Sequence, residues 1–259
     1  MGRTTTGVDP AELESKVKDM YRAVAEAPDG SYHFEMGRHL AEGLGYPASA
    51  LDVVPREAVE SFAGVGYFFD LAQLADGEDV LDLGSGSGMD SFIAANSIGA
   101  DGSVVGVDMT PEQLDKAERV RSQHGFTQVR FTEGRIERLS FPDASFDVVI
   151  SNGVINLSQG KDRVFAEAAR VLRPGGRLAL ADIVTETQLT PKIKCNADLW
   201  ASCIGGAAQH DAYQGSIEAA GLQIELMHKN PYRFISDQAR RASQTFGVMS
   251  VSLLARKPH

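Results

Sequence analysis

The stretch Val80-Leu81-Asp82-Leu83-Gly84-Ser85-Gly86-Ser87-Gly88 decides the fold of this 259-residue chain. Its first half is an apolar strand, and its second half is a glycine-rich turn that opens a helical pattern over residues 88–98. Glycines let the backbone turn sharply and let a ligand approach peptide groups, and the amides at the start of the next helix offer a positive dipole end. The stretch therefore predicts a nucleotide-like ligand at the carboxyl end of a strand.

Apolar strands and helical patterns alternate outward from this turn. We expect helices at residues 88–98, 111–123, 161–172 and 211–220, and strands at 80–83, 103–107, 128–132, 146–151, 177–183, 222–227 and 248–255. This alternation is typical of an α/β fold, here with a seven-stranded, doubly wound and mostly parallel sheet. Because the last strand follows only a short helix, we expect an antiparallel hairpin at the C-terminal edge of the sheet.

The N-terminal part of the chain has a different pattern. Asp9 as N-cap and Pro10 at the first helical position begin a helix. The helices expected in this part cover about residues 10–27, 38–44 and 56–73. We therefore expect residues 1–75 to form a helical cap, or lid, that is not an independent domain. Residues 76–259 then form the ligand-binding domain, with an insertion at about 185–210.

Composition narrows the class of protein. The net charge of −10 argues against a nucleic-acid backbone as the main partner, because such proteins present basic surface. No stretch approaches the roughly 18 consecutive apolar residues of a membrane helix, and the start lacks an apolar signal core, so we expect a soluble, cytoplasmic protein without a membrane partner. Two cysteines can neither build a disulfide framework nor close a zinc site, and no metal is expected.

The second strand supplies the next functional residue. It ends at Asp108, where a carboxylate can accept both hydroxyls of a ribose, although a plain helix cap is the alternative role. Thr110 as N-cap, Pro111 at the first position and Gln113 as the partner in a capping box predict the start of the next helix. Met89 stands where a dinucleotide-binding turn needs its third glycine, which disfavours a nicotinamide or flavin cofactor.

These motifs, in this order, resemble the class I, seven-stranded S-adenosylmethionine-dependent methyltransferases. The segments that carry the resemblance are residues 81–84 (LDLG), 104–108 (VVGVD), 134–137 (GRIE), 146–152 (FDVVISN) and 170–178 (RVLRPGGRL). The similarity runs from about residue 60 to the end of the chain. Asp82 falls on the acid of the first family motif, Asp108 on the ribose-binding acid, and residues 134–137 on the segment that frames the adenine.

The resemblance implies S-adenosylmethionine as the methyl donor, with S-adenosylhomocysteine as a product. The residues that it implies in cofactor binding are Tyr21, Asp82, Gly84, Ser85, Gly86, Gly88, Asp108, Met109, Gln113, Gly134, Arg135, Ile136, Glu137 and Asn152. The implied reaction is an in-line displacement of a methyl group from a sulfonium. Catalysis of such a step rests mostly on positioning the acceptor and excluding water.

A narrower resemblance concerns the acceptor. Met109-Thr110 with Gln113-Leu114, and residues 151–157 (SNGVINL), 181–184 (ADIV) and 200–207 (WASCIGGA), are similar to arsenite methyltransferases. That family binds trivalent arsenic through cysteine thiolates, which suit a thiophilic ion.

The chain departs from this family at its thiols. Gly153 stands at one thiol position and residues 64–66, with Val65 in the middle, at another, so that only Cys203 keeps a family thiol. On one helix, Cys195 would lie about 12 Å from Cys203, too far to share an ion. We therefore expect a small-molecule acceptor, with methylation of arsenite or methylarsenite through Cys203 as the alternative.

The catalytic residue stays open at this point. The candidates are Cys203, His33, His39, His210 and Asn156, and each has an ordinary alternative role as a packed or surface residue. A further hypothesis from another class is a non-catalytic protein that binds S-adenosylmethionine without turnover. The sequence leaves the acceptor, the methylated atom and the oligomeric state undetermined.

Overall fold

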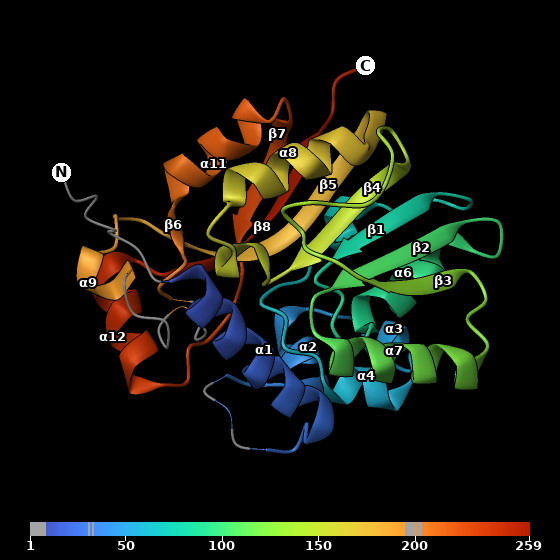
Figure 1. The fold of residues 1–259 in the computed structure, drawn as a ribbon, viewed down its shortest axis with the longest axis horizontal. Helices are drawn as coiled ribbons and strands as arrows, with labels where there is room; N and C mark the ends of the chain where they lie inside the picture. Colours follow the sequence, from blue (N-terminus) through green and yellow to red (C-terminus); the bar gives the residue numbers. More distant parts are fainter. Residues whose placement is uncertain (1–8, 31, 33, 195–199, 201–203) are drawn as a thin grey trace.

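The computed structural model describes residues 9–30, 32, 34–194, 200 and 204–259. At its centre is a sheet in the order β3-β2-β1-β4-β5-β8-β7, with the two-residue β6 paired to β5 beside this path (Figure 1). The strands are β1 (Asp79–Leu83), β2 (Ser103–Asp108), β3 (Val129–Glu133), β4 (Phe146–Asn152), β5 (Leu172–Thr185), β6 (Ala208–Gln209), β7 (Gln223–Lys229) and β8 (Met249–Arg256).

Strand directions confirm the predicted α/β sheet. β1 pairs in parallel with β2 and β4, β2 with β3, and β4 with β5. β8 is antiparallel to both β5 and β7, so the expected C-terminal hairpin forms at the edge of the sheet. The strand order reverses between β1 and β4, and such a reversal opens a crevice at the carboxyl ends of the strands where ligands bind.

Helices cover both faces of the sheet. One face carries α2 (Gly37–Leu44), α3 (Ala48–Leu51), α4 (Arg56–Glu60), α5 (Phe69–Ala72), α6 (Met89–Ile98) and α7 (Pro111–His124). The other face carries α8 (Lys161–Val171) and α11 (His210–Ala219). The two-residue period of a strand explains the division, because Val80 packs in the first of these cores and Leu81 in the second.

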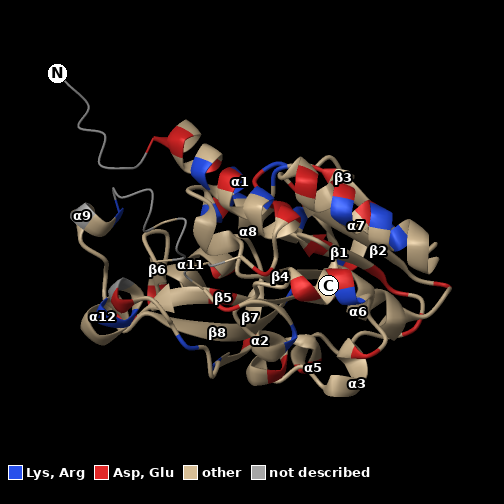
Figure 2. Cartoon of the chain, turned by 90° about the horizontal axis from the view of Figure 1, so that it is seen from below, with Lys and Arg blue, Asp and Glu red and all other residues tan. Residues whose placement is uncertain are grey.

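One of the remaining helices, α12 (Asp237–Phe246), also packs against the first of these cores through Ala239 and Ala242. α1 (Pro10–Glu26) packs along α7, and Asp9 caps it as predicted by accepting a hydrogen bond from the Ala11 amide. Acidic and basic residues alternate on α1 and α7, a pattern typical of solvent-facing helices (Figure 2). The other short elements are η1 (Ile155–Leu157) and α9 (Pro191–Lys194). Among the helices that the structure describes, none is both long and apolar enough to cross a membrane.

The helix predicted over residues 56–73 is wrong. The chain forms α4, then an irregular segment over residues 61–68, then α5. Within that segment the Val65 amide donates to Asn152 Oδ1 at 2.8 Å, and Asn152 Nδ2 donates to the Gly66 carbonyl at 3.0 Å. A continuous helix would use these backbone groups internally, so their bonds to a distant strand end override the local helical preference.

Candidate functional site

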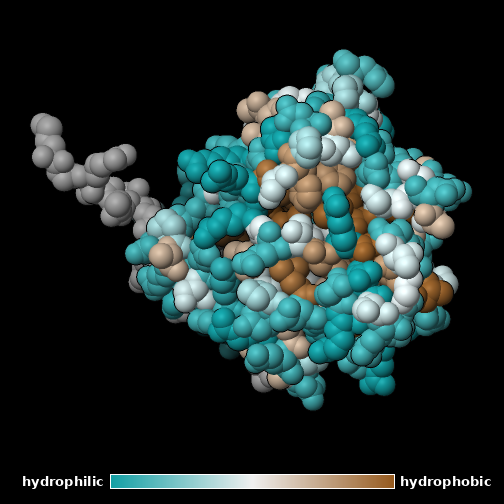
Figure 3. Space-filling view, turned by 45° about the vertical axis from the view of Figure 1, so that its right-hand side comes forward, coloured by the Kyte–Doolittle hydropathy of each residue, from teal (hydrophilic) through white to brown (hydrophobic). Residues whose placement is uncertain are grey.

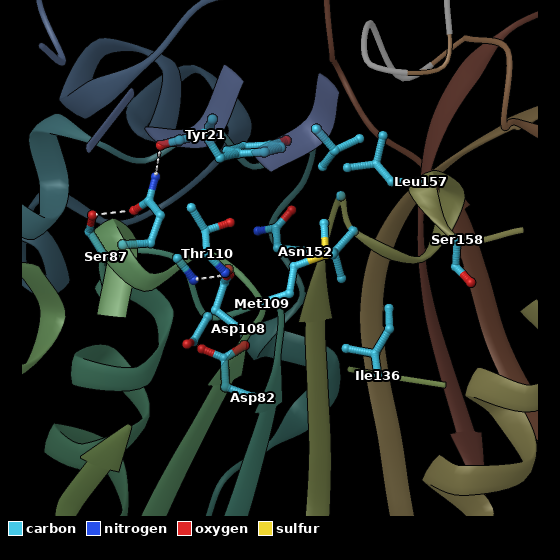
Figure 4. Close-up of a pocket in the computed structure, with 18 of the residues that line it drawn as sticks. Tyr21, Asp82, Ser87, Asp108, Met109, Thr110, Ile136, Asn152, Leu157 and Ser158 are labelled. Atoms are coloured by element: carbon cyan, nitrogen blue, oxygen red, sulfur yellow. Dashed lines mark hydrogen bonds between the residues drawn. The ribbon is translucent and has the colours of Figure 1, made fainter. Parts of the chain in front are cut away.

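A pocket lies at the carboxyl ends of β1, β2 and β4, where the sheet order reverses. The glycine-rich turn after β1, the residues after β2, the segment after β3 and the end of β4 form its sheet side, and α1 forms the opposite side. Figure 4 shows Tyr21 of α1 on one side and Asp82 and Asp108 at the strand ends on the other. In Figure 3, hydrophobic residues gather in a hollow of a surface that is otherwise largely hydrophilic.

The turn after β1 is held against β2. The amides of Gly84 and Ser85 donate to the Val107 carbonyl at 2.8 and 3.0 Å. Gly84 has a positive φ of 74°, and a Cβ there would lie 2.6 Å from the Val154 side chain, so glycine is required at this position. The Ser85 hydroxyl is buried and has no hydrogen-bond partner among the described residues. The turn therefore forms a narrow cradle on the pocket, and the Ser85 hydroxyl lies buried within it.

Asp108 stands at the end of β2, as predicted, and lines the pocket. Its carboxylate accepts hydrogen bonds from the amides of Gly86 and Thr110, both at 2.9 Å. Burial raises the pKa of Asp108, and the backbone hydrogen bonds oppose this rise. The bonds fix the orientation of the carboxylate and leave it further lone pairs for a ligand.

The predicted capping box at the start of α7 does not form. Thr110 is the N-cap but its side chain makes no capping hydrogen bond. Gln113 instead reaches across the pocket edge, where Nε2 donates to the Tyr21 carbonyl at 2.8 Å and Oε1 accepts from the Ser87 hydroxyl (Figure 4). The Gln113 side chain thus joins α1 to the glycine-rich turn. These hydrogen bonds to distant residues take the place of the predicted capping bond.

Residues 134–137, which follow β3, form the far end of the pocket. Ile136 is buried, and Arg135 forms a salt bridge with Glu14 of α1. Glu137 accepts a hydrogen bond from the Ser158 hydroxyl. Residues 134–145 are all described and contain no helix. Of these, residues 134–137 line the pocket directly.

The base of the pocket holds the predicted Asp82 and, beside it, Asp90, which sequence reasoning missed. Asp90, in the first turn of α6, accepts from the Tyr46 hydroxyl at 2.7 Å and from Asn152 Nδ2 at 3.0 Å. Asp82 accepts from the Ser91 hydroxyl at 2.6 Å. An acid at a helix start is ordinary in sequence, and only the fold reveals that Asp90 is buried in the pocket beside Asp82.

The α1 side of the pocket is mostly apolar. Leu13 and Val17 form a small cluster with Leu157, against which Tyr21 and Met109 pack. All five residues line the pocket.

Most of the acceptor-side candidates do not line this pocket. His39 is exposed on α2, and His210 begins α11 with Nε2 3.0 Å from the Met227 sulfur. Asn156 is fully buried next to the pocket residue Leu157, and neither atom of its amide has a partner among the described residues. Cys203, Cys195 and His33 lie outside the described residues.

The two positions aligned with family thiols meet in space. A Cβ placed on Gly153 would lie 3.2 Å from Cγ1 of Val65. Gly153 lines the pocket and Val65 lies buried behind it. Two thiols at these positions would be close enough to share one ion, whereas this chain presents a hydrogen atom and an isopropyl group.

Comparisons with known proteins agree with this geometry. A family model described as "Methyltransferase domain" matches residues 74–221. An arsenite methyltransferase of Halobacterium salinarum is 35% identical over 266 residues, covering 96% of this chain and 68% of that protein. One of Aquipseudomonas alcaligenes is 48% identical over 173 residues, but the match covers 64% of this chain and 50% of that protein.

A solved structure supports the same relationship. An arsenic(III) S-adenosylmethionine methyltransferase from Chlamydomonas reinhardtii matches with a TM-score of 0.69 at 34% identity, covering 82% of this chain and 72% of that one. The glycine-rich turn, the acid at the end of β2 and the strand order all agree with the family that the sequence resembles. The chain belongs to the class I S-adenosylmethionine-dependent methyltransferases.

Proposed function

We propose that this enzyme methylates a small, uncharged and largely apolar organic molecule. The observation that carries the proposal is the contact between Val65 and Gly153, where the arsenite methyltransferases are expected to hold thiols. The adjoining pocket wall is aliphatic, with Leu13, Val17 and Leu157 facing the interior. Such a wall favours an apolar acceptor, and the buried carboxylates at the base disfavour an anionic one.

The proposal includes a placement for S-adenosylmethionine. We assign the ribose to Asp108, the adenine to residues 134–137, and the methionine part to the turn at residues 84–88 with Asp82 beneath it. The support is chemical: one pocket is lined by an oriented carboxylate at Asp108, by the buried Ile136 and by the glycine-rich turn of residues 84–88.

When bound, S-adenosylmethionine supplies an electrophilic methyl group. In this proposal the chain positions the acceptor and excludes water. The cluster of Leu13, Val17 and Leu157 excludes water, and Asn152 fixes the loop that carries Val65. Of the histidines that the structure describes, none lines the pocket. We therefore propose catalysis by alignment of the acceptor without a histidine base, and a neutral hydroxyl or enol acceptor gives up its proton to solvent when the methyl group is transferred.

We also propose that residues 1–75 serve as a cap on a catalytic domain of residues 76–259. The packing of α1 along α7 and its contribution to the pocket support this role. The helices α2 to α5 share one hydrophobic core with the sheet, which supports a cap that does not fold by itself.

Methylation of trivalent arsenic through Cys203 is the second candidate. The names of the two relatives and of the matched structure favour it, since each is described as an arsenite or arsenic(III) methyltransferase. One thiolate binds a thiophilic ion less well than two or three, so this candidate needs a further thiol from the solution.

Release of S-adenosylhomocysteine distinguishes the two candidates. The enzyme would be incubated with S-adenosylmethionine and either a panel of neutral phenols and enols or arsenite with a thiol reductant. We expect release with an organic acceptor, and unchanged rates in Cys203→Ser and in the control Cys195→Ser. Formation of methylated arsenic that is lost in Cys203→Ser and kept in Cys195→Ser would overturn the first candidate.

A further inference from the structure

Two buried carboxylates lie side by side in the pocket without a cationic partner. Asp82 is 2% exposed and Asp90 6%, and both line the pocket. Their hydrogen-bond donors are neutral, namely the Ser91 hydroxyl for Asp82, and the Tyr46 hydroxyl and the Asn152 amide for Asp90. In the described part of the chain, no lysine, arginine or histidine forms a salt bridge with either group.

The charged neighbours of this pair are acids. From β2, Asp108 adds a third negative charge near Asp82, while α6, β4 and the Tyr46 segment contribute only the neutral donors. Arg135 is the one basic side chain among the described residues that line the pocket, and it pairs with Glu14 at the rim. The base of the pocket is thus a compact anionic site.

Two ionised carboxylates are costly in such surroundings, because each is desolvated and each repels the other. Burial, and secondarily the charge of Asp90, raise the pKa of Asp82 to about 8. Burial raises the pKa of Asp90 to about 6, against the opposing effect of its hydrogen bonds from Tyr46 and Asn152. Near neutral pH the ligand-free pair therefore holds about one proton, which belongs to the pair more than to either group.

S-adenosylmethionine carries two positive groups, a sulfonium and an ammonium, and one carboxylate, so its methionine end has a net positive charge. We propose that Asp90 joins Asp82 in binding this cationic end, and that binding releases to solvent the proton that the two carboxylates hold. Tyr46 and Asn152 act as positioning residues, since their donors stabilise the ionised form of Asp90 and aim it at the pocket. The inference concerns the methyl donor alone and does not depend on which acceptor is methylated.

Asn152 connects the carboxylate pair to the loop that carries Val65 and Gly66, because the same amide that donates to Asp90 also bonds this loop. With a pKa of about 6, Asp90 is mostly ionised above neutral pH, and a charged acceptor binds a donor more tightly. The bond to Asn152 therefore holds the loop in place before the cofactor binds.

Calorimetry with S-adenosylmethionine tests the proposal without any acceptor. Titrations at pH 7.5 in phosphate and in Tris differ in binding heat, because the two buffers take up the released protons with different ionisation enthalpies. The difference gives the number of protons released per site. We expect release of roughly three-quarters of a proton per site, the protonated fraction of a group with a pKa of about 8. The affinity should rise with pH between 6 and 8, by up to about tenfold per unit. S-adenosylhomocysteine, which lacks the sulfonium charge, should release less.

Variants distinguish a role of Asp82 and Asp90 in cofactor binding and proton release from a purely structural role. Asp90→Asn should reduce the released proton count by half or more and weaken affinity at pH 8 about tenfold, because the neutral amide no longer raises the proton affinity of Asp82. Tyr46→Phe keeps both carboxylates and should move the release to higher pH. The control is Asp101→Asn, which removes an exposed carboxylate outside the pocket and should leave the proton count unchanged.

Heats that are the same in both buffers for the unmodified enzyme would overturn the proposal. So would a proton count in Asp90→Asn equal to that of the unmodified enzyme. If Asp90→Asn does not fold, the shift of the pH profile in Tyr46→Phe decides, and an unshifted profile counts against the proposal.

Discussion

The two walls of the pocket are built in different ways. On the sheet wall, Asp108 is fixed by two backbone amides, and Asn152 uses both atoms of its amide to hold neighbouring segments. On the α1 wall, Leu13 and Val17 meet Leu157 in a small apolar cluster. Polar bonds to a rigid sheet orient the groups before a ligand arrives, whereas a few aliphatic contacts can part and re-form.

The attachment of α1 is itself uneven. Its C-terminal end is anchored where the buried Lys116 donates to the Ala25 carbonyl at 3.2 Å and to the Ser61 hydroxyl at 2.6 Å. Towards the pocket, the links are the Gln113 bond to Tyr21 and surface ion pairs. We therefore expect the sheet wall to recognise the cofactor, and we propose that the first half of α1 opens and closes over it.

Breaking the sheet wall should have the largest effect. Asp108→Ala removes the proposed ribose contact and the acceptor of two turn amides. Hydrogen bonds to a charged group contribute about 1.5–3 kcal/mol each, so we expect S-adenosylmethionine affinity to fall by at least about 30-fold. Calorimetry measures this, with the exposed Asp101→Ala before the same strand as control. Equal affinities of the two variants would remove Asp108 from the site.

The buried carboxyl groups of the sheet wall should also make the ligand-free protein less stable at alkaline pH than at acidic pH. The folded-state pKa values of Asp82 and Asp90 are raised to about 8 and 6, so between about pH 4 and 8 the folded state binds more protons than the unfolded state. Stability then falls as pH rises through this window. We expect Tm without cofactor to drop by roughly 5 °C or more from pH 5.5 to 8.5.

The variant Asp82→Asn is the control for this decrease in Tm with pH. A neutral amide cannot titrate, so most of the decrease in Tm between pH 6 and 8 should disappear. A slope in Asp82→Asn as steep as that of the unmodified protein would assign the pH dependence to other groups.

Local sequence patterns were sufficient for the sheet wall. The turn at residues 84–88 and the acid at Asp108 each sit at a strand end, and parallel strands bring those ends to one edge. The strand positions follow from apolar runs that must be buried on both faces. These features are encoded within a few neighbouring residues, and the structure confirms the predicted sheet.

Features that depend on distant partners were not predictable in this way. Tyr46 bonds Asp90 across 44 positions, and Asn152 bonds Val65 across 87. Gln113 follows a capping pattern in the sequence yet bonds Tyr21 across 92 positions. In each case a polar group satisfies a buried partner that only the tertiary fold brings near, and a local signal is absent or misleading.

Removing the Gln113 hydrogen bonds, which tether the middle of α1 to α7 and the glycine-rich turn, should have an intermediate effect. Gln113→Ala removes the bonds to the Tyr21 carbonyl and the Ser87 hydroxyl. Two hydrogen bonds of about 0.5–1.5 kcal/mol each predict an increase of about tenfold in KM for S-adenosylmethionine. Proteolysis within α1 should also become faster. The exposed Gln123→Ala on the same helix is the matched control, and if it raises KM equally, the tether has no part in closure.

Removing a surface ion pair of α1 should have the smallest effect. Arg22 bonds Glu112 at 2.6 Å, but the Arg22 side chain is 43% exposed and that of Glu112 29%, so water and salt screen much of the attraction. We expect Arg22→Ala to change KM by less than about threefold and Tm by less than about 2 °C. Steady-state kinetics at 50 and 500 mM salt would measure the first. A change as large as that of Gln113→Ala, persisting at high salt, would mean that ion pairs hold α1 closed and that the contrast between the two walls is smaller than their hydrogen bonds indicate.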